Sequence, residues 1–442
     1  MENFIEEHKD LLIKITQEIL RVPSVESKAT DDAPFGEDVK NALLKALDIT
    51  KELGFHTVNL DNIIGYAEFG EGKDVISVLG HLDVVPAGDG WLYPPFGAEI
   101  HDGKIYARGA TDDKGPTMAA LFGAYALKET KTPLSKKVRI VFGTNEESGW
   151  KCMDYFRAVV KDPLVGFAPD ANFPLINREK GILTVIMKKN FKEKNAEVLI
   201  KGGNRPNMVP DYASATFINA VPPIKESESV EVKENSVIAH GKSAHAALPE
   251  KGINAIVKLA DTILPSIKGE EVKAVLQFIL DKVDKDVYGG LMGINFEDEP
   301  SGKLTMNLGM IEINETEAEL VFNIRYPVTD NAKRIVQKMD EVAISYGLRV
   351  KDHRDQRPLF VKEDSEIVKT LLKVYEETTG MKGYTLSIGG GTYARAMDLG
   401  VAFGPTFEGM EEVEHMANEY IAIDHLVRIA KIYERAIFEL AK

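Results

Sequence analysis

The sequence predicts an α/β domain, built on a mixed and mainly parallel sheet with helices on both faces, into which an α+β domain is inserted. In the N-terminal part of the chain, short apolar runs alternate with helical patterns, which is typical of α/β layers. From about Gly181 onward, strand patterns alternate with charged runs, which is typical of an antiparallel sheet with helices. The α/β domain is expected to comprise residues 1–182 and 357–442, and the insertion residues 183–356.

The first predicted elements establish the α/β pattern. Apolar residues at helical spacing predict a helix over Phe4–Leu20 and a second one over about Gly36–Leu53. Ile63–Phe69 and Val75–Leu79 are apolar runs too short for helices, so they are predicted to be neighbouring strands.

A polar motif, GHLDVVPAGDGW, follows the predicted strand Val75–Leu79 and places His81 and Asp83 at its C-terminal end. Open α/β sheets build their sites at such ends. Two residues apart on extended backbone, both side chains point the same way, so Asp83 can hold one imidazole nitrogen while the other faces a metal ion. The alternative is a histidine satisfied by hydrogen bonds at a strand edge, and this stretch alone leaves both open.

Acidic residues lie next to the ends of three further predicted elements. One pair comes just before a helix predicted over Pro116–Thr130, another follows the strand Lys137–Gly143, and a single acid follows the strand Leu164–Ala168. Each could cap a helix or lie in a solvated loop. Their convergence on one sheet edge is less easily explained that way. These acids are Asp112 and Asp113, Glu146 and Glu147, and Asp170.

The later elements are predicted in the same manner. A hairpin is expected from Lys303–Ile313 and Ala318–Tyr326, and helices over about Glu366–Thr379 and over residues 423–440. Between these last two helices, Gly389, Gly390 and Gly391 allow a ligand to approach the backbone closely. A phosphate loop is disfavoured there because no Gly-Lys-Ser/Thr ending follows.

Composition restricts the function. Lys and Arg number 54 against 69 Asp and Glu, which gives a formal charge of −15 and argues against nucleic acid as a partner. Cys152 is the single cysteine, so neither a disulfide framework nor a thiolate metal cluster is expected, and a cytoplasmic location is favoured. No apolar run approaches the roughly 18 residues of a membrane span, so no membrane partner is expected.

The candidate ligands are two histidines and several carboxylates. Such a set suits Zn²⁺, Mn²⁺ or Co²⁺ better than Ca²⁺ or Mg²⁺, which seldom bind imidazole. Two ions about 3.5–4 Å apart need one bridging carboxylate and terminal ligands on each side, and the chain offers enough of both.

Six motifs carry a resemblance to a known family. They are HLDVVPAGDGW, ARGATDDKGP, NEESGW, FAPDANFP, AHGKSAHAALPEKGINA and EEVEHMANE. Together and in this order they resemble the co-catalytic metallopeptidase family that includes aminoacylase, glutamate carboxypeptidase and the bacterial peptidase V dipeptidases. The double Asp, SIGGGTYAR and NMVPD are most similar to the peptidase V branch.

The resemblance implies a role for each metal ligand. His81 and Asp170 would hold one ion, Glu147 and His415 would hold the other, and Asp112 would bridge them. The Asp112–Asp113 peptide bond would be cis. These implied ligands leave two nearby carboxylates for other roles: Asp83 would orient His81, and Glu146 would be the general base.

The inserted domain would act as a lid that supplies substrate-binding groups. The resemblance implies that His245 donates a hydrogen bond to the oxyanion and that Asn207 touches substrate. Arg325 and the backbone N–H groups of Gly389–Gly391 would bind the substrate's C-terminal carboxylate. Arg325 could instead form an ordinary ion pair on its strand.

The sequence therefore predicts a metal-dependent dipeptidase that hydrolyses short unblocked peptides through a water bound to two divalent ions, with zinc preferred over manganese or cobalt. An N-acyl-amino-acid deacylase or a carboxypeptidase on the same metal site is the alternative. A non-catalytic metal-dependent binding protein is an alternative of another class, against which the free carboxylate of Glu146 argues. The expected partner is a small peptide, and the chain is expected to be a monomer or a homodimer.

Overall fold

The computed structural model describes residues 2–442 and divides into two compact units. Unit 1 comprises the described residues up to Asn177, together with Val361–Leu386 and Thr392–Lys442, and unit 2 comprises Arg178–Phe360 and Ser387–Gly391. The expected domain boundaries lie a few residues from these, and residue 1, where the first expected domain starts, is outside the described residues. Gly389–Gly391 groups with unit 2, whereas the sequence placed it in the α/β domain.

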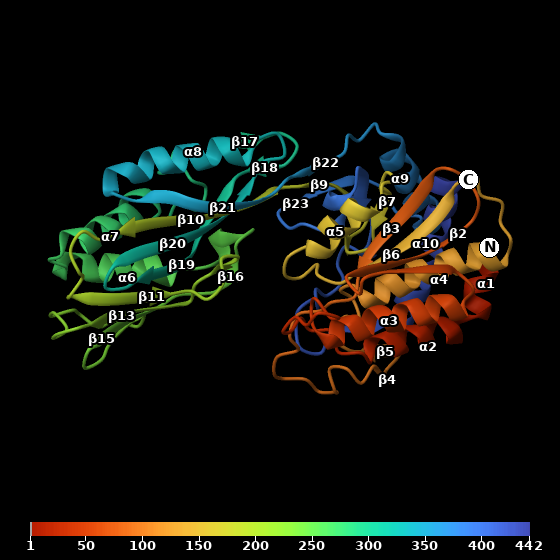
Figure 1. The fold of residues 1–442 in the computed structure, drawn as a ribbon, viewed down its shortest axis with the longest axis horizontal. Helices are drawn as coiled ribbons and strands as arrows, with labels where there is room; N and C mark the ends of the chain where they lie inside the picture. Colours follow the sequence, from red (N-terminus) through yellow and green to blue (C-terminus); the bar gives the residue numbers. More distant parts are fainter. Residues whose placement is uncertain (1) are drawn as a thin grey trace. The chain divides into compact units, whose positions relative to one another are not determined.

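A nine-stranded mixed sheet forms the centre of unit 1, and the chain enters unit 2 along one of its strands and returns along another (Figure 1). The order is β1-β2-β6-β3-β7-β24-β9-β22, with β23 paired to β9. The strands are β1 (His56–Leu60), β2 (Ile64–Phe69), β3 (Val75–His81), β6 (Lys137–Gly143), β7 (Val165–Ala168), β9 (Leu175–Glu179), β22 (Leu359–Phe360), β23 (Thr385–Ile388) and β24 (Leu399–Ala402).

The four middle strands of this sheet are parallel. β3 pairs in parallel with both β6 and β7, and β7 pairs in parallel with β24, while the outer pairings are antiparallel. Every residue of β3 is buried, which explains its continuous apolar run. Because β3, β6 and β7 run in the same direction, the three loops that follow them meet at one edge of the sheet. The predicted fold class is confirmed, including the mixed sheet.

Helices cover both faces of this sheet. On one face, Gly65 of β2 packs closely on Leu43 of α3 (Glu37–Glu52), and Gly80 of β3 packs on Thr117 of α4 (Lys114–Glu129). On the opposite face, the ring of Tyr66 packs on Phe156 of α5 (Lys151–Val159). The predicted helix over Phe4–Leu20 is two helices, which break at His8. The helices are α1 (Glu2–Glu7), α2 (Lys9–Leu20), α3 (Glu37–Glu52), α4 (Lys114–Glu129), α5 (Lys151–Val159), α9 (Glu366–Thr379) and α10 (Ile423–Ala441). Among the described residues, no helix is long and apolar enough to cross a membrane.

Small strand pairings in unit 1 bring distant segments together. A three-stranded sheet joins β4 (Glu99–His101), β5 (Lys104–Tyr106) and β26 (Tyr420–Ala422), so the segment before β26 lies beside the segment after β5. A second pairing joins β8 (Ala171–Asn172) to β25 (Pro405–Thr406), and the 3₁₀ helix η4 spans Tyr393–Ala396.

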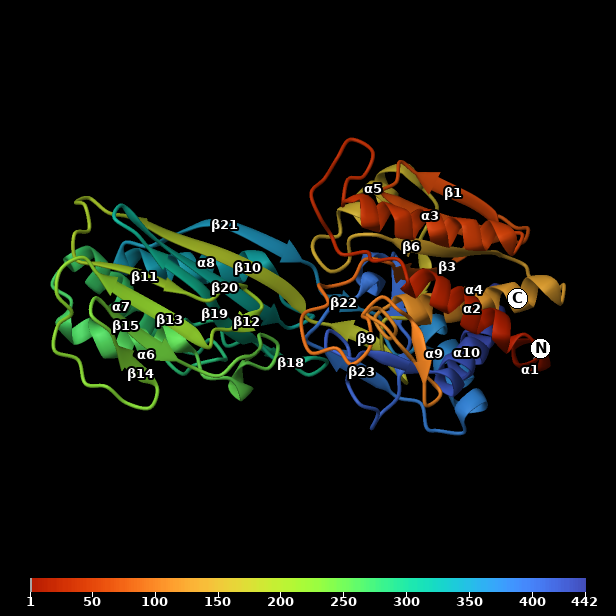
Figure 2. The same ribbon diagram turned by 90° about the horizontal axis from the view of Figure 1, so that it is seen from below.

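Unit 2 is built on an antiparallel sheet of eight strands, covered by helices α6, α7 and α8 (Figure 2). The order is β14-β15-β13-β11-β19-β20-β10-β21. Alternate residues of β10 are buried, which fits a sheet with one face on the core. The strands are β10 (Gly181–Asn190), β11 (Val198–Gly202), β13 (Tyr212–Phe217), β14 (Val230–Val232), β15 (Ser236–His240), β19 (Thr305–Ile313), β20 (Glu317–Tyr326) and β21 (Arg349–Gln356).

The remaining elements of unit 2 are three α-helices, three 3₁₀ helices and two small strand pairings. The helices α6 (Ala255–Ile263), α7 (Glu270–Lys282) and α8 (Ala332–Ala343) are accompanied by η1 (Pro249–Lys251), η2 (Leu264–Ser266) and η3 (Ile344–Tyr346). Two-stranded pairings join β12 (Met208–Val209) to β16 (Ala244–His245) and β17 (Glu297–Asp298) to β18 (Gly302–Lys303).

The two ends of the insertion meet in unit 1. The backbone N–H of Val361 donates to the carbonyl of Asn177 at 2.9 Å. The side-chain amide of Asn177 donates back to the carbonyl of Val361 at 2.7 Å. The residues that flank the insertion are therefore hydrogen-bonded to each other.

Candidate metal centre

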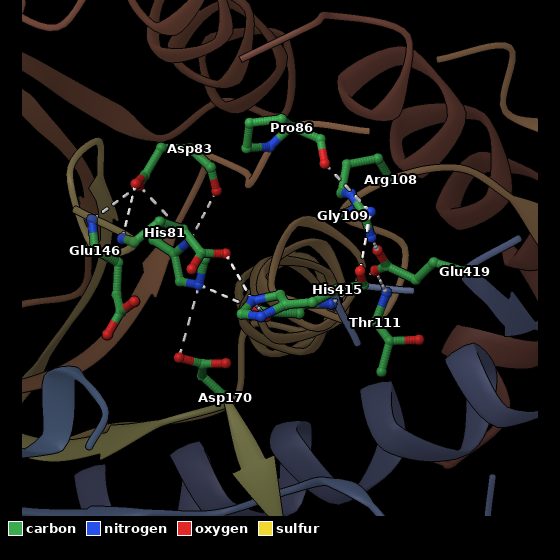
Figure 3. Close-up of polar contacts among 12 residues, drawn as sticks. His81, Asp83, Pro86, Arg108, Gly109, Thr111, Glu146, Asp170, His415 and Glu419 are labelled. Atoms are coloured by element: carbon green, nitrogen blue, oxygen red, sulfur yellow. Dashed lines mark hydrogen bonds and ion pairs between the residues drawn. The ribbon is translucent and has the colours of Figure 1, made fainter. Parts of the chain in front are cut away.

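The five predicted metal ligands converge at the edge of the unit 1 sheet. Figure 3 shows three of them, His81, Asp170 and His415. His81 ends β3, Glu147 follows β6 and Asp170 follows β7, so three neighbouring parallel strands deliver them. Asp112 lies just before α4, and His415 lies on the segment that leads into β26. Ligand atoms of His81, Asp112 and Glu147 all lie within 4.8 Å of one another.

Asp112 lies between the two histidines and faces each with a different oxygen. Its Oδ1 is 3.0 Å from Nε2 of His81, and its Oδ2 is 2.9 Å from Nε2 of His415. Asp170 Oδ2 is 3.6 Å from the same nitrogen of His81, and Glu147 Oε1 is 3.1 Å from that of His415. The groups thus form two sets, each with one imidazole and one terminal carboxylate, that share Asp112.

The backbone of Asp83, more than its carboxylate, orients His81. Nδ1 of His81 is 2.9 Å from the carbonyl oxygen of Asp83 and 3.6 Å from its Oδ1. A donor at Nδ1 leaves Nε2 to face Asp112 and Asp170. The sequence predicted an orienting role for Asp83, and the structure gives the closer contact to the main chain.

The carboxylate of Asp83 instead accepts hydrogen bonds from the loop after β6. The backbone N–H of Glu146 donates to Oδ1 and that of Glu147 donates to Oδ2, each at 3.0 Å. Asp83 is buried, so these charge-assisted bonds fix the loop firmly. One residue therefore connects the orientation of His81 with the placement of Glu146 and Glu147.

Asp113, the next residue after Asp112, supports the site from another direction. The Asp112–Asp113 peptide bond is cis, as the resemblance implied. Oδ2 of Asp113 accepts hydrogen bonds from the backbone N–H of His81 at 3.1 Å and from the hydroxyl of Thr117 at 2.8 Å. Asp113 is thus directed to the backbone of His81, while Asp112 is directed to the imidazoles.

The acids of the cluster are buried close to one another, which changes their pKa values. Burial and the nearby carboxylates raise the pKa of Asp170, Glu146 and Glu147 above the usual values. Burial would also raise the pKa of Asp112, but hydrogen bonds from both histidines hold it well below the usual value. Hydrogen bonds with Asp112 and Glu147 raise the pKa of His415 to about 11. The cluster therefore favours added positive charge.

These residues fit a pair of divalent ions. The donor set is imidazole nitrogen and carboxylate oxygen, which suits borderline transition metals. The two sets that share Asp112 match the need of a dinuclear site for one bridging carboxylate and terminal ligands on each side. The raised pKa values of Asp170, Glu146 and Glu147 are those expected where cations would stabilise the charged forms.

Two residues that the sequence analysis did not single out lie directly behind the ligands. Arg108 and Glu419 are buried and form an ion pair, with Nη1 of Arg108 at 2.7 Å from Oε2 of Glu419. A signal was present in ARGATDDK, where a lone arginine stands among small residues that are themselves suited to burial. Glu419 stands in EEVEHMANE, four residues after His415.

The predicted substrate-binding residues all lie in unit 2, where they form two groups. The carbonyl of Asn207 accepts a hydrogen bond from the N–H of Ala246 at 2.9 Å, and His245 pairs with Met208 between β12 and β16. Asn207 and His245 are thus side by side. In the second group, Nη1 of Arg325 donates to the carbonyl of Gly389 at 2.9 Å.

Unit 2 also contains asparagines that hold these residues. Oδ1 of Asn323 accepts from Nε of Arg325 at 2.9 Å. The side-chain amide of Asn307 donates to the carbonyls of Pro206 at 3.1 Å and Met208 at 2.8 Å, on both sides of Asn207. Both asparagines are buried in adjacent strands of the sheet. Neither had been identified from the sequence.

Comparison with known proteins agrees with this geometry. The family profile described as Peptidase family M20/M25/M40 matches residues 78–439. The chain is 42% identical over 456 residues to the protein named Putative dipeptidase YtjP of Bacillus subtilis, with 98% of each chain covered. It is 37% identical over 459 residues to the Beta-Ala-Xaa dipeptidase of Lactobacillus delbrueckii subsp. lactis, covering 99% of this chain and 97% of that protein.

Solved structures support the fold. An M20 family metallo-carboxypeptidase from Sulfolobus solfataricus superposes with a TM-score of 0.61 at 16% identity, covering 97% of this chain and 99% of that chain. The dipeptidase Dug1p of Saccharomyces cerevisiae superposes with a TM-score of 0.59 at 14% identity, covering 99% of this chain and 97% of that one. At such identities the likeness concerns the fold alone.

Proposed function

The chain belongs to peptidase family M20/M25/M40, and we propose from this premise that it is a metal-dependent dipeptidase that cleaves short peptides with a free amino terminus. It is a metallopeptidase of this family, and its full-length relatives are named as dipeptidases. One observation carries the assignment of the site. Asp112 faces His81 with one oxygen and His415 with the other, which is the arrangement that two metal ions with a shared carboxylate require.

The residues that would hold the ions form the two sets described above. His81 and Asp170 would bind one ion, Glu147 and His415 the other, and Asp112 both. When bound, such ions polarise the carbonyl of the scissile bond and make water a better nucleophile near neutral pH. We propose zinc as the ion, with manganese or cobalt as substitutes, because these ligands accept all three.

Glu146 is the proposed general base. Its neighbour Glu147 is directed to His415, while the backbone N–H groups of both residues are held by Asp83. Burial raises the pKa of the Glu146 carboxyl, and a carboxylate with a raised pKa is a stronger proton acceptor. Glu146 would take a proton from the attacking water and pass it to the leaving amine.

Unit 2 is proposed to bind substrate as a lid. His245 would donate a hydrogen bond to the oxyanion, and its neighbour Asn207 would touch the substrate. Arg325, with the backbone of Gly389–Gly391, would bind the C-terminal carboxylate, a role for which a guanidinium is suited. The hydrogen bond between Arg325 and Gly389 supports grouping these two elements in one subsite.

We also propose a cellular location, a class of partner and an assembly for the protein. A cytoplasmic location is supported by the single cysteine, Cys152, which is buried. The formal charge of −15 supports small peptides, not nucleic acid, as partners. A monomer or a homodimer remains our expectation for the assembly.

The test is hydrolysis of a substrate panel by chelated protein reloaded with Zn²⁺, Mn²⁺ or Co²⁺. The panel contains unblocked dipeptides, their N-acetylated counterparts, tripeptides and N-acyl amino acids. Turnover confined to unblocked dipeptides supports the dipeptidase and identifies the working ion. Preference for acylated substrates would reassign the chain to a deacylase. Absence of turnover with every ion, in protein that binds the ions, would favour a non-catalytic binding protein.

A further inference from the structure

A buried ion pair behind the metal centre connects three of the segments that carry its ligands. Arg108 and Glu419 are separated by 311 residues in sequence, yet Nη1 and Oε2 are 2.7 Å apart. Both side chains are almost completely inaccessible to solvent, at 2% and 0% exposure. Burial of two charges is expensive, so such a pair is weak evidence for stability and calls for another explanation.

The guanidinium of Arg108 holds two loops through their carbonyls, and Figure 3 shows it directed to the carbonyl of Pro86 in the first of them. Nη2 donates to the carbonyl of Ala87 at 3.2 Å, in the loop that follows His81 and Asp83. It also donates to the carbonyl of His415 at 3.3 Å, and Nη1 donates to that of Met416 at 3.1 Å. A single planar group thus fixes the loop behind one histidine ligand and the backbone of the other.

The backbone at His415 needs such support. His415 has a φ of 63°, in the left-handed region that residues other than glycine seldom adopt. Its side chain is 53% exposed, so packing does little to hold the imidazole toward Asp112 and Glu147. The two carbonyl bonds from Arg108 are therefore a principal restraint on this ligand.

The carboxylate of Glu419 holds the segment of the bridging ligand. Oε1 accepts from the backbone N–H groups of Thr111 at 2.8 Å and Asp112 at 3.2 Å. Oε2 accepts from the backbone N–H of Gly109 at 3.1 Å, in addition to Arg108. Each oxygen thus has two donors, and three N–H groups of one turn converge on a single carboxylate.

From these contacts we propose that Arg108 and Glu419 are a positioning pair that sets the affinity of the centre for its metal ions, above all in the half that uses His415. The pair acts through the hydrogen bonds that fix the backbones of Asp112 and His415. Outer partners that orient metal ligands typically contribute 10–100-fold to metal affinity. The inference rests on the proposed function, because it requires that the centre binds two ions.

The experiment measures metal binding, independently of turnover. Chelated wild type, Arg108→Met, Arg108→Lys and Glu419→Gln are dialysed against buffered Zn²⁺ at a series of free concentrations, and bound ions per chain are counted. Arg108→Lys keeps the charge but cannot hold several carbonyls in one plane. Arg139→Met is the matched control, because Arg139 is also a buried arginine of unit 1 paired with acids, Glu68 and Asp162, near the opposite end of β6. Circular dichroism verifies that each variant is folded.

We expect all three variants of the pair to retain about one ion per chain at free Zn²⁺ that saturates two sites in the wild type. The affinity for the second ion should fall about 10–100-fold, while Arg139→Met binds two ions as the wild type does. If Arg108→Lys and Glu419→Gln both bind two ions with wild-type affinity, the inference is overturned and the proposed function stays intact. A wild type that binds none of Zn²⁺, Mn²⁺ and Co²⁺ would overturn the proposed function and the inference with it.

Discussion

His415 and Glu147 meet across 268 residues of sequence, with Nε2 of the imidazole 3.1 Å from Oε1 of the carboxylate. The same nitrogen lies 2.9 Å from Oδ2 of Asp112, whose other oxygen is directed to His81. Glu147 is thus near one histidine, as a terminal ligand would be, whereas Asp112 is near both, as a shared ligand would be. It predicts different losses of metal when each carboxylate is changed.

Glu147→Gln should lose one of the two ions per chain, because it removes a terminal charge from one set only. Asp112→Asn should weaken both ions, because both sets share its carboxylate. Metal content after dialysis against a fixed free Zn²⁺ concentration measures the difference. Glu414→Gln is the control, since Glu414 is adjacent to His415 but accepts from the hydroxyl of Thr406. Equal losses from Glu147→Gln and Asp112→Asn would contradict the bridging assignment.

Glu146→Gln should retain both ions and lose turnover. The amide keeps the shape of the side chain but cannot accept the proton of the attacking water, and general base catalysis contributes about 10²–10⁴-fold to a rate. The value of kcat for an unblocked dipeptide and the metal content of the same sample are measured together. Loss of metal in this variant would show that Glu146 is a ligand, and wild-type turnover would exclude it as the base.

Asp83→Asn should destabilise the metal-free protein as well as the centre. Asp83 accepts from the N–H groups of Glu146 and Glu147, and an amide can accept from only one of them. The loss of a buried hydrogen bond to a charged group costs about 1.5–3 kcal/mol in the free energy of unfolding. Urea denaturation in the presence of a chelator measures it. Asp89→Asn, at an exposed position of the same motif, should change stability little.

Asn323→Leu should weaken substrate binding more than it slows the chemical step. Oδ1 of Asn323 accepts from Nε of Arg325, the proposed carboxylate-binding group. We expect KM to rise about 10-fold with a smaller change in kcat, as for the loss of a contact made equally in ground and transition states. Asn195→Leu is the control, because the Asn195 amide is also buried in unit 2 and holds the carbonyls of Val198 and Asn314. An unchanged KM would exclude the orienting role of Asn323.

His425 should make stability fall in mild acid. Burial and Arg428 lower its pKa to about 4 from an ordinary value of 6.5, so the unfolded chain takes up a proton at a pH where the folded chain does not. The contribution of His425 to the free energy of unfolding is fully present above pH 6.5. It decreases as the pH falls toward 4, by at most about 1.4 kcal/mol per pH unit. The difference in unfolding free energy between wild type and His425→Gln, followed from pH 7 to 4, measures it. A difference that does not vary with pH would contradict the lowered pKa.

The convergence of three candidate ligands could be predicted from the sequence because each of them follows a strand pattern. Apolar strand runs end just before His81, Glu147 and Asp170, and parallel strands bring such ends together. The assignment of Asp112 as the bridge came from the family resemblance and not from spacing. The class of the fold followed from the alternation of strands and helices, which local composition determines.

What could not be predicted depends on contacts between distant segments. The pairing of Arg108 with Glu419 joins positions 311 residues apart, and no periodic pattern identifies either one. The contact of the Asp83 carboxylate with the backbone of the next strand's loop likewise exists only in the folded chain. At the break between α1 and α2, Nδ1 of His8 is 2.9 Å from the carbonyl of Phe4, a side-chain contact that apolar spacing alone does not predict.

The mutual hydrogen bonds between Asn177 and Val361 make the long insertion a cassette. A short turn between these two residues would suffice to close unit 1, because they are already hydrogen-bonded to each other. Insertions could then be exchanged between relatives at this junction, which would transfer Asn207, His245 and Arg325 but leave Gly389–Gly391 and the candidate metal ligands in the host chain. The insertion and the unit that holds the candidate metal ligands could therefore vary independently of each other among relatives.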